Sequence, residues 1–425
     1  MLALIALIGL NLRPFLTASG PILSSIEADT GMGYSGLAML TLLPILLMGA
    51  GAFFAPGIQA AVGTRRGLLA ALLVLMLGSL LKLAVSEGLS LIMTAALCGA
   101  GVAFIQAVLP GIIKEKFPAN VSAVTGLYSA MIMGGGALGA RLTPILVGSE
   151  NNWQSALAWL ALPAGVTLVA AFRILSNAKV AKPDHSLTVA LLRRPRTWAL
   201  MAAFGLVNGG YSSMVAWLAP YYQSQRWGIA TSGNLVAVMA VFQAVSALTI
   251  PVLARRSIDR RPWLYTTLLM QAIGFSGLTF FPAASPAFWA AVCGAGLGGS
   301  FSLSIVAALD HLPQPEQAGT LTALMQGGGF LIAALAPLAT ALLHDWSGSF
   351  VSGWVMHLGC IAVAFSLYMR LDPARYADVM GPSLTWPKSA RKRPVAPESG
   401  IEPTYGGDHG YPDIRKTSRT ISPTV

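Results

Sequence analysis

Charged residues are scarce in this chain. Only 10% of its 425 residues are Asp, Glu, Lys or Arg, 55% are hydrophobic, and the mean hydropathy is +0.67. A soluble protein could not keep so much apolar surface away from water. The cysteines Cys98, Cys293 and Cys360 have neither disulfide nor metal-ligand spacing, and the sequence has no Walker motif, nucleophile elbow or metal-ligand cluster. These absences exclude a soluble protein and argue against an enzyme, a metal site or a cofactor.

What the chain does have is a series of long apolar runs. Runs of about 20 residues, the length that crosses a bilayer, recur along the sequence. They predict an all-α membrane protein with twelve transmembrane helices. We place the helices at residues 2–26, 35–61, 67–84, 89–114, 121–147, 153–174, 197–222, 232–254, 262–281, 286–309, 319–343 and 350–370.

The basic residues follow the predicted topology. A net charge of +11 would suggest nucleic-acid binding in a soluble protein. With the N-terminus placed in the cytoplasm, Arg13 and Arg141 lie inside spans, and every other Lys and Arg except Lys82 and Arg226 lies on the cytoplasmic side. This bias predicts a multi-pass protein of the cell inner membrane, with both termini in the cytoplasm. We therefore expect a lipid bilayer around the chain and no nucleic-acid partner.

The sequence repeats itself. Cys98-Gly99-Ala100-Gly101 recurs as Cys293-Gly294-Ala295-Gly296, and Arg65-Arg66 recurs as Arg260-Arg261. Parallel repeats of a helical membrane unit are typical of secondary transporters, whose substrate binds between two lobes near the membrane midplane. The repeat predicts two pseudo-symmetric six-helix lobes, and we expect a monomer. We assign residues 1–175 to the N-terminal lobe, 176–196 to a cytoplasmic linker, 197–371 to the C-terminal lobe and 372–425 to a disordered cytoplasmic tail.

The loop after the second predicted helix resembles a family motif. It reads Gly57-Ile-Gln-Ala-Ala61-Val-Gly63-Thr-Arg65-Arg66, and is similar to the signature loop of the major facilitator superfamily, except that the usual acidic position is Ala61. The resemblance implies that Gly57, Gly63, Arg65 and Arg66 gate the cytoplasmic side.

Further motifs resemble one branch of that superfamily, the cyanate transporter family. They are Gly9-Leu10-Asn11-Leu12-Arg13-Pro14, Ile105-Gln106-Ala107-Val108-Leu109-Pro110, Met133-Gly134-Gly135-Gly136, Asn208-Gly209-Gly210-Tyr211, Ala308-Leu309-Asp310-His311 and Met325-Gln326-Gly327. The resemblance covers residues 1 to about 372. It implies transport by alternating access, with a small anion as the substrate and cyanate as the first candidate.

Arg13 is the strongest candidate for a substrate-binding residue. It lies in an apolar helix near the bilayer centre, where insertion scales give a cost of about 2.5–3.5 kcal/mol for Arg. None of the acidic residues lies in the middle of a predicted span. A buried cation without a protein counter-ion favours an anionic ligand, and the guanidinium fork suits small oxyanion-like groups. The alternative is that Arg13 binds backbone carbonyls.

Other polar residues could complete the site. Arg141 could add a second cation or extend to the membrane surface. Asn208 and Tyr211 are three residues apart and so share a helix face, whereas Asn11 points away from Arg13 and is expected to pack against a neighbouring helix. The remaining candidates, Gln106 and Gln326, could either contact the substrate or bond helices together.

Asp310 and His311 end the tenth predicted helix on the cytoplasmic side. A gate or helix cap is the interpretation we favour. Proton coupling through His311 is the alternative, since histidine titrates near neutral pH.

Two other functions stay open. One is export of a nitroimidazole-like or other small organic compound, which would depend on aromatic walls more than on Arg13. The other is a membrane sensor or receptor that binds a small ligand without moving it.

Overall fold

The computed structural model describes residues 1–32, 34–147, 152–176 and 185–381. Within these residues every regular element is a helix, which confirms the predicted all-α fold. The long elements are α4 (Tyr34–Val62), α5 (Thr64–Leu80), α6 (Gly88–Lys116), α7 (Val121–Val147), α9 (Ala161–Ile174), α11 (Pro195–Ser224), α12 (Ile229–Ala254), α13 (Arg261–Phe280), α14 (Pro286–Asp310), α15 (Pro315–Ser347) and α16 (Val351–Met369).

Ten of the described helices are long and apolar enough to span a membrane. The two remaining predicted spans are α13 and the first helix. The first helix is not continuous over residues 2–26, because it is divided into α1 (Leu2–Asn11), α2 (Pro14–Thr17), a 3-10 turn (Gly20–Ile22) and α3 (Leu23–Thr30). Proline has no backbone N–H to donate to the preceding turn, so Pro14 ends α1 and starts α2.

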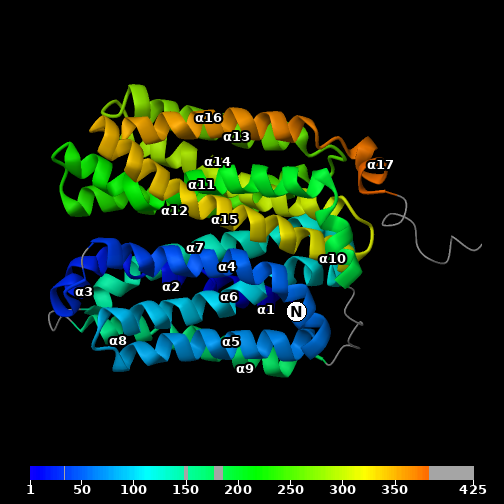
Figure 1. Cartoon of the computed structure of the whole chain (residues 1–425), viewed down its shortest axis with the longest axis horizontal. Coiled ribbons are helices and arrows are strands. Elements are labelled where there is room, and N and C mark those ends of the chain that lie inside the picture. The colour runs from blue at the N-terminus through cyan, green and yellow to red at the C-terminus, as the bar shows by residue number, and fades with distance from the viewer. Residues whose placement is uncertain (33, 148–151, 177–184, 382–425) are drawn as a thin grey trace, which may run out of the picture. The chain divides into compact units, whose positions relative to one another are not determined.

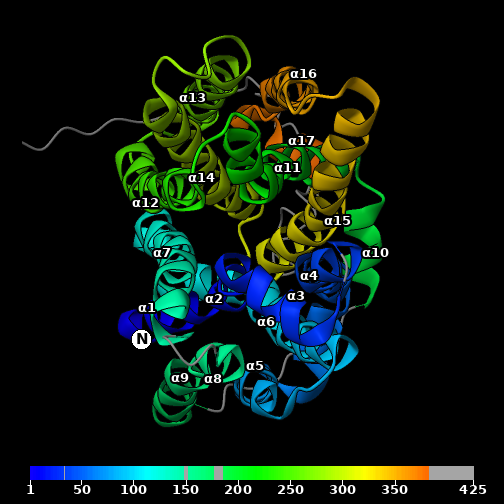
Figure 2. The ribbon, with the colours of Figure 1, turned by 90° about the vertical axis from the view of Figure 1, so that its left-hand side faces the viewer.

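The helices form two lobes, which Figure 2 shows one above the other. In the N-terminal lobe α4 and α5 pack on α6, and α1 packs on α7. In the C-terminal lobe α11 packs on α15, while α12 and α13 pack on α14. The lobes meet along two seams, where α4 and α6 lie against α15 and where α7 lies against α12 and α14 (Figures 1 and 2).

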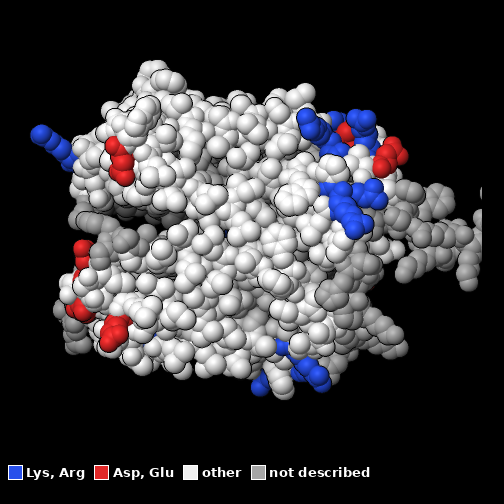
Figure 3. Space-filling model, in the orientation of Figure 1, with Lys and Arg blue, Asp and Glu red and all other residues white. Residues whose placement is uncertain are grey.

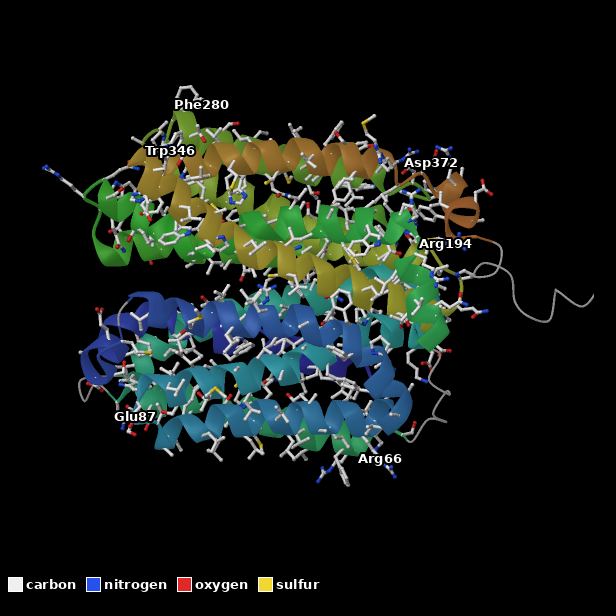
Figure 4. All side chains as sticks on the ribbon, viewed as in Figure 1. Arg66, Glu87, Arg194, Phe280, Trp346 and Asp372 are labelled. Atoms are coloured by element: carbon white, nitrogen blue, oxygen red, sulfur yellow. The ribbon has the colours of Figure 1, made fainter. Side chains whose placement is uncertain are left out.

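The two ends of the helices differ in charge. Arg66, Arg194 and Asp372 lie at one end, and Glu87 and Trp346 lie at the other (Figure 4). Most of the visible Lys and Arg gather at the first end, which also holds α17 (Tyr376–Met380) (Figures 1 and 3). We call this the α17 end and the opposite one the α3 end.

Two short helices lie in segments that the sequence assigned to the linker and the tail. The linker contains α10 (His185–Leu192), and residues 177–184 of it lie outside the described residues. The predicted disordered tail begins with a 3-10 turn (Pro373–Arg375) and α17, because Met380 and Leu371 are buried against the C-terminal lobe. Residues 382–425 lie outside the described part of the chain.

Contacts between the lobes concentrate at the α17 end. A Cβ at Gly319 of α15 would lie 2.9 Å from the Cα of Gly111 on α6. A Cβ at Gly126 of α7 would lie 3.0 Å from the carbonyl oxygen of Leu248 on α12. Toward the α3 end the surface is hollowed between the lobes (Figure 3). The lobes are therefore closed at the α17 end and apart at the α3 end.

Substituting Gly319 tests this closure. In G319V the side chain meets the backbone of α6, which cannot move aside as a flexible side chain could, so we expect the lobes to separate at the α17 end. The measurement is thiol labelling of a cysteine introduced at Ser122, in a background without the three native cysteines, and labelling should rise several-fold. G134V is the control, since a Cβ at Gly134 has no neighbour within 4 Å. Equal labelling in all variants would contradict the closure.

Candidate functional site

A cavity lies between the lobes, about halfway along the spans. Its volume is about 20 Å³, enough for one or two water-sized groups. Each lobe contributes four lining residues: Arg13, Leu16, Ile45 and Met48 from the N-terminal lobe, and Asn208, Tyr211, Ser212 and Phe330 from the C-terminal lobe. A group bound there touches both lobes, so its binding is sensitive to their relative position.

Arg13 brings a charge into this cavity. The residue is only 4% exposed, and its guanidinium has no hydrogen bond or ion pair with any described residue. Its contacts are aromatic, because the guanidinium carbon lies 4.7 Å from the ring centroid of Tyr211 and 5.9 Å from that of Phe301. Both rings belong to the other lobe. Cation–π contacts stabilise a cation without neutralising it, so the site keeps its positive charge.

The sequence around Arg13 explains its position. Arg13 precedes Pro14 at the break between α1 and α2, with φ −117° and ψ −23°. The glycines of α7 let the broken helix approach closely: a Cβ at Gly136 would lie 3.3 Å from the Arg13 Cβ, and one at Gly139 would lie 2.9 Å from the Pro14 Cα. The Thr17 hydroxyl donates a 2.7 Å hydrogen bond to the carbonyl oxygen of Gly136. The glycine run thus positions the cation.

The structure brings some of the predicted binding residues together. Asn208 and Tyr211 both line the cavity with Arg13, as their spacing of three residues predicts. Asn11 instead points to α9, where its side-chain amide donates a 2.9 Å hydrogen bond to the Thr167 hydroxyl. Arg141 is exposed on α7 and is not among the cavity-lining residues. The geometry therefore offers one buried arginine here and no two-arginine clamp.

Gln106 and Gln326 lie in the seam between α6 and α15. The Gln326 side-chain amide donates a 3.1 Å hydrogen bond to the carbonyl oxygen of Gln106. Both amide atoms of the Gln106 side chain, and the Gln326 side-chain oxygen, are buried without a partner among the described residues. Unpaired buried amides are costly, so these side chains have polar groups available for a ligand or water.

Three residues near Arg13 could not be assigned to the site from the sequence. The sequence assigns neither Ser212 nor Phe301 to the site, and it does not indicate Tyr128 as a polar group of the site. Tyr128 is fully buried, and its hydroxyl has no partner among the described residues. One signal was present: at the spacing that separates Cys98 from Cys293, the counterpart of Gln106 is Phe301.

The signature loop contacts its own lobe. The Arg65 side chain donates a 2.7 Å hydrogen bond to the carbonyl oxygen of Leu175, and its guanidinium lies 5.0 Å from the ring centroid of Phe172, both near the end of α9. Arg66 is exposed. Gly57 lies within α4, and Gly63 caps α5 with φ 92°, a value that favours glycine. In this conformation these contacts of Arg65 hold the loop to the end of α9.

The second copy of the loop does reach across. Arg260 forms an ion pair with Asp310 at 2.9 Å and a 3.5 Å hydrogen bond with the Ser122 hydroxyl of the N-terminal lobe. Beside it, the Lys114 ammonium of α6 donates to the carbonyl oxygens of Leu309 and Leu312 at the end of α14. A lysine at a helix C-terminus is favourably placed. These groups join the lobes at the α17 end.

His311 lies beside these contacts. It is 2% exposed, its Nδ1 lies 2.6 Å from the carbonyl oxygen of Ala307, and its ring stacks on Tyr376 of α17 at 3.8 Å. Burial lowers the pKa of His311 to about 3, and the positive charges of Arg196 and Lys114 act in the same direction. The ring is therefore neutral at physiological pH, which disfavours proton coupling through it in this conformation.

Comparison with known proteins identifies this architecture. Residues 5–337 match the family model of the Major Facilitator Superfamily. The chain belongs to the major facilitator superfamily. Over 382 residues it is 41% identical to the cyanate transport protein of Escherichia coli strain K12, covering 89% of this chain and 99% of the relative. It is also 28% identical over 374 residues to the 2-nitroimidazole transporter of the same organism, covering 87% and 93%.

Solved structures agree on the fold. The proton:xylose symporter has a TM-score of 0.71 at 13% identity, covering 87% of this chain and 95% of that one. The fucose:proton symporter of E. coli has a TM-score of 0.68 at 12% identity, covering 87% and 98%. These identities support the fold alone. The predicted major facilitator fold and the predicted membership of the cyanate transporter family are both confirmed, and the protein is a membrane transporter.

The low pKa of His311 predicts how stability depends on pH. The folded chain keeps this ring neutral down to about pH 3, whereas in the unfolded chain it is protonated below about pH 6.5. Its contribution is complete above about pH 6.5 and is lost as the pH falls toward 3. We expect the Tm of the wild type to fall more than that of H311Q between pH 7.5 and about 5, measured in detergent. H344Q, a change at the α3 end, should follow the wild type.

Proposed function

We propose that this protein is a secondary active transporter of a small monovalent anion, with cyanate as the first candidate, and that it works by alternating access. Arg13 carries the proposal, because a buried guanidinium without a protein counter-ion needs an anion. The 41% identical relative is named as a cyanate transport protein, which supports the choice of substrate. We further propose that the chain lies in the cytoplasmic membrane as a monomer, with both termini and the α17 end in the cytoplasm.

The cavity favours a substrate of few atoms. Cyanate is a linear anion of three atoms that can accept hydrogen bonds at both ends, so of the candidates it needs the least enlargement of a cavity of about 20 Å³. Arg13 would supply the charge, and Asn208 and Tyr211 would orient the ion against it. Gln106 and Gln326 would contact the substrate after the lobes move, since their unpaired amide groups lie in the seam.

Transport would then require the contacts along the two seams to separate and form again as the lobes move. With the α17 end in the cytoplasm, the described conformation faces outward. Closing the α3 end over a bound anion would require the contacts of Gly111 with Gly319, of Lys114 with α14, and of Arg260 with Ser122 to separate. We propose these contacts as the cytoplasmic gate. Asp310 and His311 would support it, and Gly57, Gly63, Arg65 and Arg66 would keep α4, α5 and α9 together.

Export of a nitroimidazole is the second candidate. The 28% identical relative is named as a 2-nitroimidazole transporter, and Tyr211, Phe301 and Phe330 supply aromatic surface around the cavity. A five-membered ring with a nitro group exceeds the volume of the cavity, so these side chains would have to move aside. The geometry favours the smaller ion.

Ligand-induced stabilisation of the purified protein distinguishes these functions. A ligand that binds only the folded state raises the Tm once its concentration passes Kd. We expect cyanate to stabilise the wild type, and R13Q to bind at least about tenfold more weakly, because a charge-assisted hydrogen bond is lost. R141Q should respond as the wild type does, since Arg141 is exposed.

Each other outcome has a defined meaning. Stabilisation by 2-nitroimidazole alone, equal in wild type and R13Q, would assign Arg13 a structural role and reject the anion site. Loss of the cyanate response in R141Q would return Arg141 to the site. Uptake of labelled cyanate into proteoliposomes, above that of protein-free liposomes, then separates a transporter from a sensor.

A further inference from the structure

The charge of the empty site cannot change. Arginine stays protonated at any physiological pH. None of the 16 acidic residues of the sequence lies in the middle of a predicted span, and the described Glu115, Asp310 and Glu316 lie at the α17 ends of their helices. A proton therefore cannot enter or leave a carboxylate beside Arg13 to balance the site.

The histidines that the structure describes do not supply this balance either. His185 begins α10 in the linker, His311 lies at the α17 end, and His344 lies near the α3 end of α15. His357 of α16 is stacked on Phe275 of α13 at 5.1 Å and does not line the cavity. Without an anion the cavity keeps the full charge of Arg13.

The two aromatic rings that contact Arg13 belong to the other lobe. Its guanidinium lies over the ring of Tyr211 and near that of Phe301, on α11 and α14. Alternating access moves these helices relative to α1 and α2, so the cation must leave at least one of the rings while it is closed off from water at both ends. A desolvated cation without a partner opposes that movement. A bound anion removes the opposition by neutralising the guanidinium.

We propose that the protein is an anion exchanger, in which the site changes sides only when an anion is bound, so that uptake of one small anion is coupled to release of another. This inference rests on the proposed anion transport. The counter-anion has the same chemistry as the substrate: one negative charge, few heavy atoms, and acceptor atoms for Arg13. Cyanate can serve on both sides, and bicarbonate is a second anion of this class.

The test is uptake of labelled cyanate into proteoliposomes that contain the full chain. Vesicles loaded with unlabelled cyanate or bicarbonate are compared with vesicles loaded with an impermeant buffer, at alkaline pH, with subtraction of protein-free liposomes. We expect loading with cyanate to accelerate the initial uptake at least about tenfold, because the unloaded site returns across the membrane slowly. Exchange of two monovalent anions moves no net charge, so an imposed potential should leave this rate unchanged.

The outcomes separate the two proposals. Equal uptake into loaded and buffer-filled vesicles, accelerated by an inside-positive potential, would leave the transporter in place and overturn the exchange. Absence of uptake in every vesicle, together with absence of a cyanate-dependent rise in Tm, would reject the proposed function itself. Acceleration by cyanate but not by bicarbonate would keep the exchange and exclude bicarbonate as the counter-anion.

A matched pair of variants tests the physical cause. Ser212 lines the cavity with Arg13, and its hydroxyl donates a 3.1 Å hydrogen bond to the carbonyl oxygen of Asn208. S212D gives the empty site a negative charge of its own, and S212N has almost the same shape without that charge. We expect the ratio of uptake with and without internal cyanate to fall toward one in S212D and to stay near the wild-type ratio in S212N. Equal ratios in two transporting variants would exclude site charge as the cause.

Discussion

The rest of this structure depends on Arg13, a buried cation near the centre of the membrane that has no acidic partner among the described residues. A guanidinium excluded from water needs either a counter-charge or a surface that tolerates it. No acidic residue of the sequence lies in the middle of a predicted span, and two aromatic rings from the opposite lobe lie against the guanidinium instead. The break at Pro14 and the glycines of α7 contribute to this arrangement, because they hold Arg13 at the seam and not within the N-terminal lobe.

The lobes differ in how they use their duplicated parts. Arg65 of the first signature loop bonds to α9 in its own lobe, whereas its repeat Arg260 pairs with Asp310 and reaches Ser122 across the seam. Lys114 from the N-terminal lobe complements this by binding the end of α14. The first loop has Ala61 at its acidic position, and the polar contacts between the lobes described at the α17 end come from the second loop and from α6.

Much of this architecture could be predicted from the sequence, since apolar runs of membrane length and an internal repeat report directly on spans and lobes. Arg13 stood out because a charge in an apolar run is rare, and Asn208 with Tyr211 because helical spacing puts them on one face. Phe301 and Tyr128 could not be assigned, because an aromatic residue in an apolar helix resembles ordinary packing until its neighbours are known. The seam contacts of Lys114 and Arg260 join residues far apart in sequence, and no local pattern indicates them.

Arg13 comes from the N-terminal half and Asn208 from the C-terminal half, so the two halves contribute a charged and a neutral side chain to one cavity. The halves have thereby ceased to be interchangeable. A protein made of two N-terminal halves would confront two guanidinium groups in a space of about 20 Å³, and one made of two C-terminal halves would hold no cation at all. Only the two unlike halves, joined in one chain and therefore in fixed proportion, keep one charge in the site.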